Sequence, residues 1–137
     1  MNPEVKTKWV AALLSGEYKQ GKGWLRSRNE EFCCLGVLCD LASKEGVGDW
    51  TLTKDATGIS TYRYVADDNP NGAELPLPVQ EWAGLDEPDP SVPVSFAAAI
   101  ASYVLDNEHT ETETTLAAVN DQKGTFTQIA KLIEETL

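Results

Sequence analysis

Residues 19–28, with the sequence KQGKGWLRSR, carry the residue types that a small nucleotide site needs. Around two glycines stand four cations and one tryptophan: Lys19, Lys22, Trp24, Arg26 and Arg28. Cations and accessible backbone amides bind phosphate, and an indole offers a flat face on which a base can stack. We therefore predict these five side chains as ligand-binding residues for a phosphate-bearing molecule. The alternative is a solvated basic hairpin whose tryptophan packs in the core.

The glycine spacing of this segment excludes two familiar phosphate-binding folds. It matches neither G-x-x-x-x-G-K-[ST] nor G-x-G-x-x-G, so the sequence predicts no P-loop and no Rossmann domain. The chain holds four tryptophans in 137 residues, and core anchoring is the usual role of such side chains. Trp24 is the one best placed to stack on a ligand ring, because cations surround it.

A second group with chemical potential comprises Cys33, Cys34 and Cys39. Zinc sites pair their ligands as C-x-x-C with a distant second pair, and neither C-C nor C-x4-C fits that pattern. A nucleophilic cysteine needs an electropositive, accessible setting, whereas the single histidine, His109, stands in an acidic stretch. Adjacent cysteines do not ordinarily bridge each other, and an odd count leaves one unpaired. We predict buried thiols in a reducing compartment, with no metal, no cofactor and no catalytic residue.

Charge is distributed unevenly along the chain. The 22 acidic and 11 basic residues give a net charge of −11, yet residues 1–28 hold six basic residues and only two acidic ones. A field of this overall sign repels a polyphosphate duplex, so we predict no general nucleic-acid binding. A small phosphate-bearing ligand at the basic end remains compatible, since distant charges are screened by salt.

Two further features exclude classes of protein. No apolar run approaches the ~18–20 residues of a membrane span, and the N-terminus lacks the layout of a secretory signal. We therefore expect a cytoplasmic protein with no membrane partner. The region 115–133 is superficially similar to a DNA-reading helix-turn-helix, but the expected outer face of its second helix offers Lys131 against Glu134 and Glu135. A packing helical hairpin is the better interpretation.

Apolar periodicity and turn residues predict one α+β domain over residues 1–137, with a small antiparallel sheet packed with four to five helices. Trp24 and Leu25 are expected to point inward from a loop or short hairpin at 17–28. A capping box at Thr125 and Gln128 begins a terminal helix. The other expected elements are helices at 3–15, 33–45, 78–83 and about 112–119, strands at 50–53 and 62–65, and a strand entering a helix at 94–105.

Four segments together resemble a group of small proteins of tailed bacteriophages and prophages. They read YKQGKGxLR from residue 18, FCCLGVLCDL from residue 32, WAGL from residue 82 and ND-x4-F-x2-IA from residue 120, and the matching regions cover about half of the chain. The resemblance implies a phage protein that acts in the cytoplasm of the bacterial host. It carries over no catalytic residue. Small phage proteins outside the structural and replication modules often antagonise host defence, which is an argument by association.

Three hypotheses follow for function. The first is a protein that binds and sequesters a nucleotide immune signal, such as a cyclic dinucleotide or an ADP-ribose derivative, without catalysis. The second is an acidic inhibitor, in the manner of a DNA mimic, that occupies the basic groove of a host protein. The third is an enzyme that cleaves such a signal. We rank them in this order, and the sequence leaves both a monomer and a homodimer open.

Overall fold

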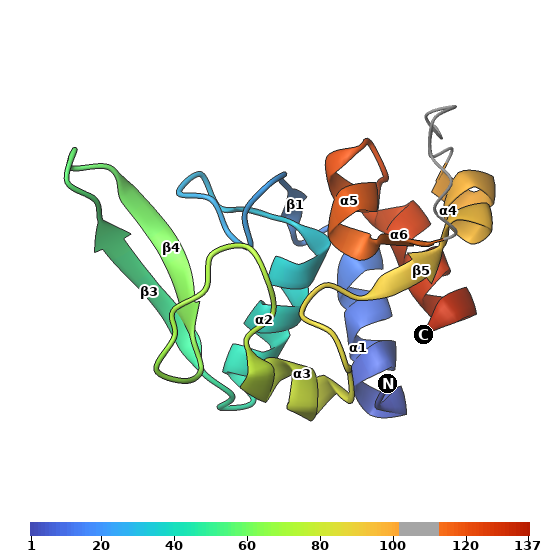
Figure 1. The fold of residues 1–137 in the computed structure, drawn as a ribbon, viewed down its shortest axis with the longest axis horizontal. Helices are drawn as coiled ribbons and strands as arrows, with labels where there is room; N and C mark the ends of the chain where they lie inside the picture. Colours follow the sequence, from blue (N-terminus) through green and yellow to red (C-terminus); the bar gives the residue numbers. More distant parts are fainter. Residues whose placement is uncertain (102–112) are drawn as a thin grey trace.

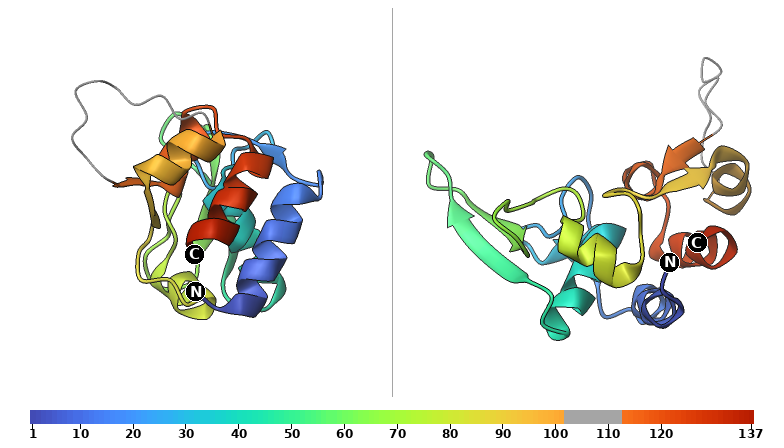
Figure 2. Two further views of the ribbon diagram at one scale, coloured as in Figure 1. Left: turned by 90° about the vertical axis from the view of Figure 1, so that its right-hand side faces the viewer. Right: turned by 60° about the horizontal axis from the view of Figure 1, so that its bottom comes forward.

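The helical layer of the molecule is formed by the two ends of the chain. In the computed structural model, which describes residues 1–101 and 113–137, helix α1 (Pro3–Leu14) packs along helix α6 (Phe126–Thr136), as Figures 1 and 2 show. Asn2 begins α1 by accepting hydrogen bonds from two backbone N–H groups of its first turn. The predicted capping box of Thr125 and Gln128 begins α6.

The central element is helix α2 (Cys34–Lys44), whose sequence is apolar on nearly every face. Its residues from Cys34 to Cys39 are all buried, so α2 forms the middle of the hydrophobic core. The indole Nε1 of Trp9, itself fully buried in α1, donates a 3.0 Å hydrogen bond to the backbone carbonyl of Cys34. The predicted helix at 33–45 is therefore confirmed to within one residue at each end.

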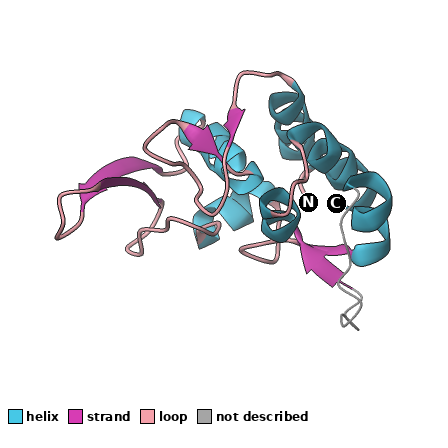
Figure 3. Cartoon of the chain, turned by 90° about the horizontal axis from the view of Figure 1, so that it is seen from above, coloured by secondary structure: helices cyan, strands magenta, loops and turns pink. Residues whose placement is uncertain are grey.

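Short strands pair in three separate places. Strand β1 (Lys19–Gln20) runs parallel to β2 (Glu31–Phe32), and β3 (Asp49–Lys54) forms an antiparallel hairpin with β4 (Ser60–Val65). Strand β5 (Ser91–Pro93) runs antiparallel to β6 (Glu113–Thr115). The α+β class is confirmed, with pairs of strands in place of one continuous sheet. The β3–β4 hairpin extends away from α1 and α6, as the view from above shows (Figure 3).

Three shorter helices complete the described residues: α3 (Leu77–Ala83), α4 (Val94–Ala101) and α5 (Leu116–Asp121). The six helices of the described ranges thus exceed the expected four to five. Helix α5 begins later than expected because residues 113–115 are not helical: they form strand β6, which pairs with β5. Helix begins directly at Val94, where a strand was expected, and the rest of that expected element lies partly outside the described residues.

The helices of the described ranges are all short. The longest, α1, has 12 residues, and none combines the length and the apolar character that crossing a bilayer requires.

The loop between β1 and β2 is fixed from one side by Asn120, which is fully buried in α5. Its side-chain oxygen accepts hydrogen bonds from the Gln20 side chain (2.9 Å) and from the backbone N–H of Cys34 (3.3 Å). Its side-chain nitrogen donates to the carbonyl of Gly21 (2.8 Å). One amide therefore joins the loop, the start of α2 and the C-terminal helices.

On its other side the same loop lies directly on α2. A Cβ atom added to Gly36 would stand 1.7 Å from the carbonyl oxygen of Leu25, whose side chain is fully buried. Glycine is therefore required at position 36 by close backbone approach, although the position is helical.

Gly36→Ala tests this close contact, because helix propensity alone predicts a more stable variant, whereas the contact predicts a less stable one. Alanine favours a helix over glycine by about 1 kcal/mol, but here the loop backbone must move away from α2. We expect a net loss of about 3 kcal/mol, measured as the free energy of unfolding in urea. Thr7→Ala on the exposed face of α1 is the matched control and should change stability by less than about 0.5 kcal/mol. An unchanged or more stable Gly36→Ala protein would contradict the contact.

Candidate functional site

A hollow of about 280 Å³ lies between the β1–β2 loop and strand β4. The loop contributes one wall and the start of β4 the other, and the two segments run near each other at the hairpin side of the molecule (Figure 1). The lining side chains come from eight positions: Trp24, Arg26, Ser27, Arg28, Ile59, Ser60, Thr61 and Tyr62. Three of the five predicted binding residues therefore line one hollow.

Arg26 is held among aromatic rings. Its guanidinium carbon lies 4.0 Å from the ring centroid of Tyr62 and 5.4 Å from the centroids of Phe32 and Trp50. Only 20% of its side chain is exposed, so the cation–π contacts operate in a partly desolvated setting where they are strongest. The arginine is thus a fixed part of the wall that joins the loop to the hairpin.

Glu30 neutralises much of the charge on Arg26. Its carboxylate accepts hydrogen bonds from two guanidinium nitrogens of Arg26 and, at 2.8 Å, from the hydroxyl of Tyr62. Burial raises the pKa of Glu30, but the hydrogen bonds from Arg26 and Tyr62 and the positive charge outweigh it, so this pKa lies below its ordinary value. Glu30 reaches this position from a left-handed backbone (φ 61°), which is uncommon for a residue with a side chain.

Trp24 and Arg28 are the accessible members of the site. The Trp24 side chain is about half exposed (52%), so the expectation that it points inward beside Leu25 is wrong: Leu25 alone is buried. The Leu25 backbone lies against Gly36 and donates to the Gly72 carbonyl (2.8 Å), whereas the Trp24 ring lies beside Gly72. Arg28 is exposed and forms no ion pair within the described residues.

Lys19 and Lys22 stand outside the hollow. The Lys19 side chain is 75% exposed, and its Nζ lies 3.8 Å from a carboxylate oxygen of Glu31. Lys22 is also exposed. The tertiary structure therefore divides the predicted set into three lining residues and two lysines at the loop surface.

The second wall of the hollow was missed by sequence reasoning. Tyr62 belongs to the alternating pattern that predicted strand β4, and this pattern indicates which residues share a face of the hairpin. Nothing in the pattern indicates that this face meets the loop at residues 24–28. The direct contacts of Arg26 and Glu30 with Tyr62 bring the two walls together, and so does the packing of the hairpin root, the part of β3 and β4 around Trp50 and Tyr64, against α2.

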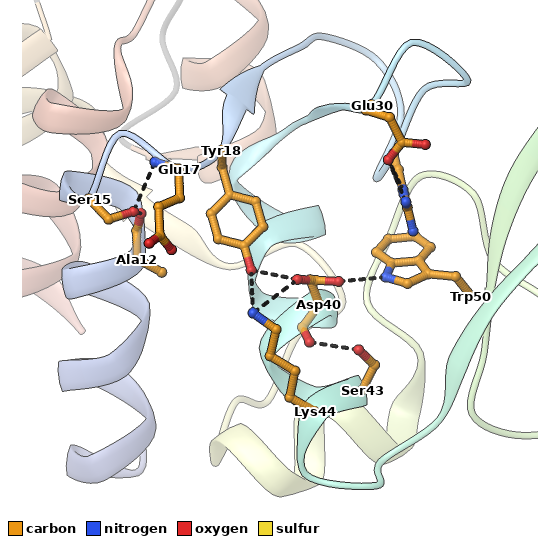
Figure 4. A network of polar contacts seen from close by, with 10 residues as sticks. Ala12, Ser15, Glu17, Tyr18, Glu30, Asp40, Ser43, Lys44 and Trp50 are labelled. Atoms are coloured by element: carbon orange, nitrogen blue, oxygen red, sulfur yellow. Dashed lines mark hydrogen bonds and ion pairs between the residues drawn. The ribbon is translucent and has the colours of Figure 1, made fainter.

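That root is anchored by Asp40 of α2, as Figure 4 shows. Its carboxylate accepts hydrogen bonds from the Tyr18 hydroxyl (2.5 Å) and from the Trp50 indole Nε1 (3.0 Å), and Lys44 Nζ lies 3.6 Å away. Burial and the Asp40 carboxylate both raise the pKa of Tyr18 above its ordinary value. The phenol therefore remains a hydrogen-bond donor throughout the neutral range.

Edge-to-face aromatic contacts extend the anchor into the hairpin. The Trp50 ring meets Phe32, Tyr62 and Tyr64 at centroid distances of 6.0, 6.3 and 5.0 Å. Tyr64 is fully buried, and its hydroxyl donates to the backbone carbonyl of Val47. Because Tyr62 is part of this stack, the wall of the hollow has a defined position.

The three cysteines are buried, as predicted, and are free thiols. Burial raises the pKa of Cys33 to about 11 and raises those of Cys34 and Cys39 well above their ordinary value. They are therefore thiols and not thiolates at neutral pH, which disfavours nucleophilic chemistry. Within the described ranges, no group of His, Cys, Asp and Glu residues has the arrangement of a metal site, and His109 lies outside those ranges.

The chain belongs to the family described as a domain of unknown function, DUF8296, whose sequence profile matches residues 1–137. No curated protein and no solved structure matches the chain significantly.

Asp40→Ala tests whether the anchor positions the hairpin. The change leaves the Tyr18 hydroxyl and the Trp50 indole N–H without their acceptor, and we expect a loss of about 1–3 kcal/mol. Amide hydrogen exchange in β3 and β4 should accelerate more than exchange in α6, which is remote from Asp40. Lys44→Ala is the control: its side chain is 65% exposed, so the loss should stay below about 1 kcal/mol. Equal acceleration in both regions would show that Asp40 has no specific role at the hairpin.

Proposed function

We propose that this protein binds a small phosphate-bearing nucleotide in the hollow between residues 24–28 and 59–62 and holds it without converting it. The observation that carries the proposal is that two aromatic rings, Trp24 and Tyr62, and two arginines, Arg26 and Arg28, line one hollow from segments far apart in the sequence. Rings that stack on bases and guanidinium groups that bind phosphate are the usual components of such sites.

The size and charge of the hollow suit one nucleotide unit. Its volume of about 280 Å³ lies just below the usual range of small-molecule sites, roughly 300–1,000 Å³. Since Glu30 offsets Arg26, Arg28 supplies the cation that is free to meet a phosphate. The half-exposed indole of Trp24 supplies the stacking surface. A ligand with two nucleotide units would place one unit here and extend the other beyond the hollow.

The lining chemistry supports binding over turnover. The eight lining residues include three aliphatic hydroxyls, those of Ser27, Ser60 and Thr61, and the phenol of Tyr62, but no carboxylate, histidine, cysteine or lysine that would act on the aliphatic hydroxyls as a base. Glu30, the carboxylate beside the hollow, is engaged by Arg26 and Tyr62. A site of this composition retains a ligand through stacking and charge.

The biological role in this proposal rests on the resemblance to phage proteins. In the cytoplasm of a bacterial host, a binder without catalysis would act by lowering the free concentration of its ligand. We therefore propose a nucleotide immune signal of the host, a cyclic dinucleotide or an ADP-ribose derivative, as the sequestered molecule.

Thermal unfolding with a panel of nucleotides tests the proposal directly. The probes are AMP, ADP-ribose and cyclic di-AMP, with adenosine and inorganic phosphate as partial ligands. A probe present at about 100 times its Kd adds about 2.7 kcal/mol, which raises the midpoint by roughly 10 °C. Trp24→Ala and Arg28→Ala should each weaken binding about ten-fold or more. Lys19→Ala and Lys22→Ala are matched controls, since both lysines lie outside the hollow, and should weaken it less than about three-fold.

The outcome of the same experiment separates the three hypotheses. A probe recovered unchanged by mass spectrometry supports sequestration, whereas a cleaved probe supports an enzyme and overturns this proposal. No midpoint shift with any phosphate-bearing probe also overturns it and leaves the acidic protein-binding inhibitor. Equal losses in the lysine and arginine variants would place the ligand at the loop surface and not in the hollow.

Glu30→Gln provides a second prediction, in which the substitution raises the affinity for the ligand. Glutamine retains an oxygen acceptor for Arg26 and Tyr62 but removes the negative charge that competes with a ligand phosphate. Affinity for the phosphate-bearing probe should rise about three- to five-fold, measured by calorimetric titration. Affinity for its phosphate-free nucleoside should not change, which is the internal control. A weaker affinity for both would show that Glu30 supports the site only as a structural element.

A further inference from the structure

Strand β3 presents an unpaired edge at the outer side of the hairpin (Figure 1). Strand β4 has β3 on one side and a bridge between Tyr64 and Asn71 on the other. On its far side β3 pairs with no strand among residues 1–101 and 113–137. A two-stranded ribbon is marginal in water, and a free edge is a template for another strand.

The hydrogen-bond pattern identifies which backbone groups face outward on β3. Tyr64 donates to and accepts from Asn71 (2.9 Å or less), so its backbone groups point away from β3 and its pair with Trp50 is a non-hydrogen-bonded one. Asp55 donates to Ile59 at the turn, which gives the same alternation. Odd-numbered residues of β3 therefore bond to β4, and the backbone groups of Trp50, Leu52 and Lys54 face outward. The Trp50 N–H donates to the Asp49 carboxylate (2.8 Å), so at that residue only the C=O group is open to another strand.

We propose that this edge pairs antiparallel with the same edge of a second copy, with Leu52 opposite Leu52 of that copy. A two-fold axis perpendicular to the sheet keeps corresponding faces of both hairpins on one side, so opposing residues must share a face. The opposing residues must also both have outward-facing backbone groups where hydrogen bonds form. Centring the pair on Leu52 satisfies both conditions at Leu52 and overlaps the strand from residue 50 to residue 54. At each end the Trp50 carbonyl accepts from the Lys54 N–H of the other copy, while the Trp50 N–H keeps its bond to Asp49.

The side chains are self-complementary in this register. Leu52 is 55% exposed in one copy and would be covered by its equivalent. Thr51 would stand opposite Thr53, a favourable cross-strand pair. Lys54 would stand opposite Trp50, whose ring already has Arg26 at 5.4 Å, so this pair adds no new cation–π contact. An unrelated peptide would have to match the leucine and threonine pairs, whereas the chain supplies both from its own strand.

The expected dimer is weak and dependent on concentration. Five residues from each strand bury less than the ~1,200 Å² of a stable interface, so we expect dissociation in the micromolar range or above. Each copy carries a net charge of −11, which opposes association, so added salt should strengthen the dimer. This inference stands apart from ligand binding, because the pairing edge and the hollow use different parts of the hairpin.

Cysteine cross-linking tests the register without any ligand. Leu52→Cys places two thiols on a hydrogen-bonded pair with Cα atoms about 5.5 Å apart, within disulfide range. Thr51→Cys is the matched control: its two copies would be offset by two residues and stand beyond the ~7 Å limit. The native cysteines are buried. Under mild oxidation at about 100 µM protein, Leu52→Cys should form at least ten-fold more covalent dimer than Thr51→Cys or the wild type.

Sedimentation velocity between about 5 and 500 µM provides the second measurement. The wild type should shift towards a dimer as concentration rises, and Leu52→Lys, which opposes two cations at the axis, should remain monomeric with an unchanged unfolding midpoint. A wild type that stays monomeric throughout would overturn the proposal. Dimerisation retained by Leu52→Lys, or equal cross-linking of the two cysteine variants, would also overturn it, because the copies would then meet elsewhere.

Discussion

The candidate site depends on a contact between two backbones. The carbonyl of Leu25 lies against Gly36 where any side chain would clash, so the loop after β1 rests directly on the central helix. Helix α2 can be approached this closely because Gly36 has no side chain at the point of contact. With Leu25 beneath the loop, Trp24 faces outward and Arg26 reaches the hairpin.

The same helix fixes the hairpin through Asp40. This carboxylate accepts hydrogen bonds from Trp50 and Tyr18. The edge-to-face contact of Trp50 with Tyr62 then fixes the position of Tyr62. The loop and the hairpin are thus both positioned by one helix, and they also contact each other through Arg26, Glu30 and Tyr62. A hollow formed by two such segments keeps its shape only while both remain attached to α2.

Arg26 has a structural role and a binding role that compete. Stacked on aromatic rings and bonded to Glu30, it joins the loop to β4 and forms part of the wall of the hollow. The same pairing reduces the positive charge available to a ligand, so Arg28 and Trp24 carry the accessible chemistry. Glu30 holds its carboxylate against the guanidinium from an uncommon left-handed backbone conformation.

The sequence by itself determined the α+β class, the positions of the main helices and the β3–β4 hairpin, because caps, turn residues and apolar periodicity are local signals. It also identified the basic loop and the burial of the three cysteines. Tertiary structure alone decided that Trp24 is exposed, that Lys19 and Lys22 stand apart, and that Tyr62 forms the second wall. Those outcomes depend on contacts between segments far apart in the chain, through Gly36, Asp40 and Glu30, and no local pattern encodes such distances.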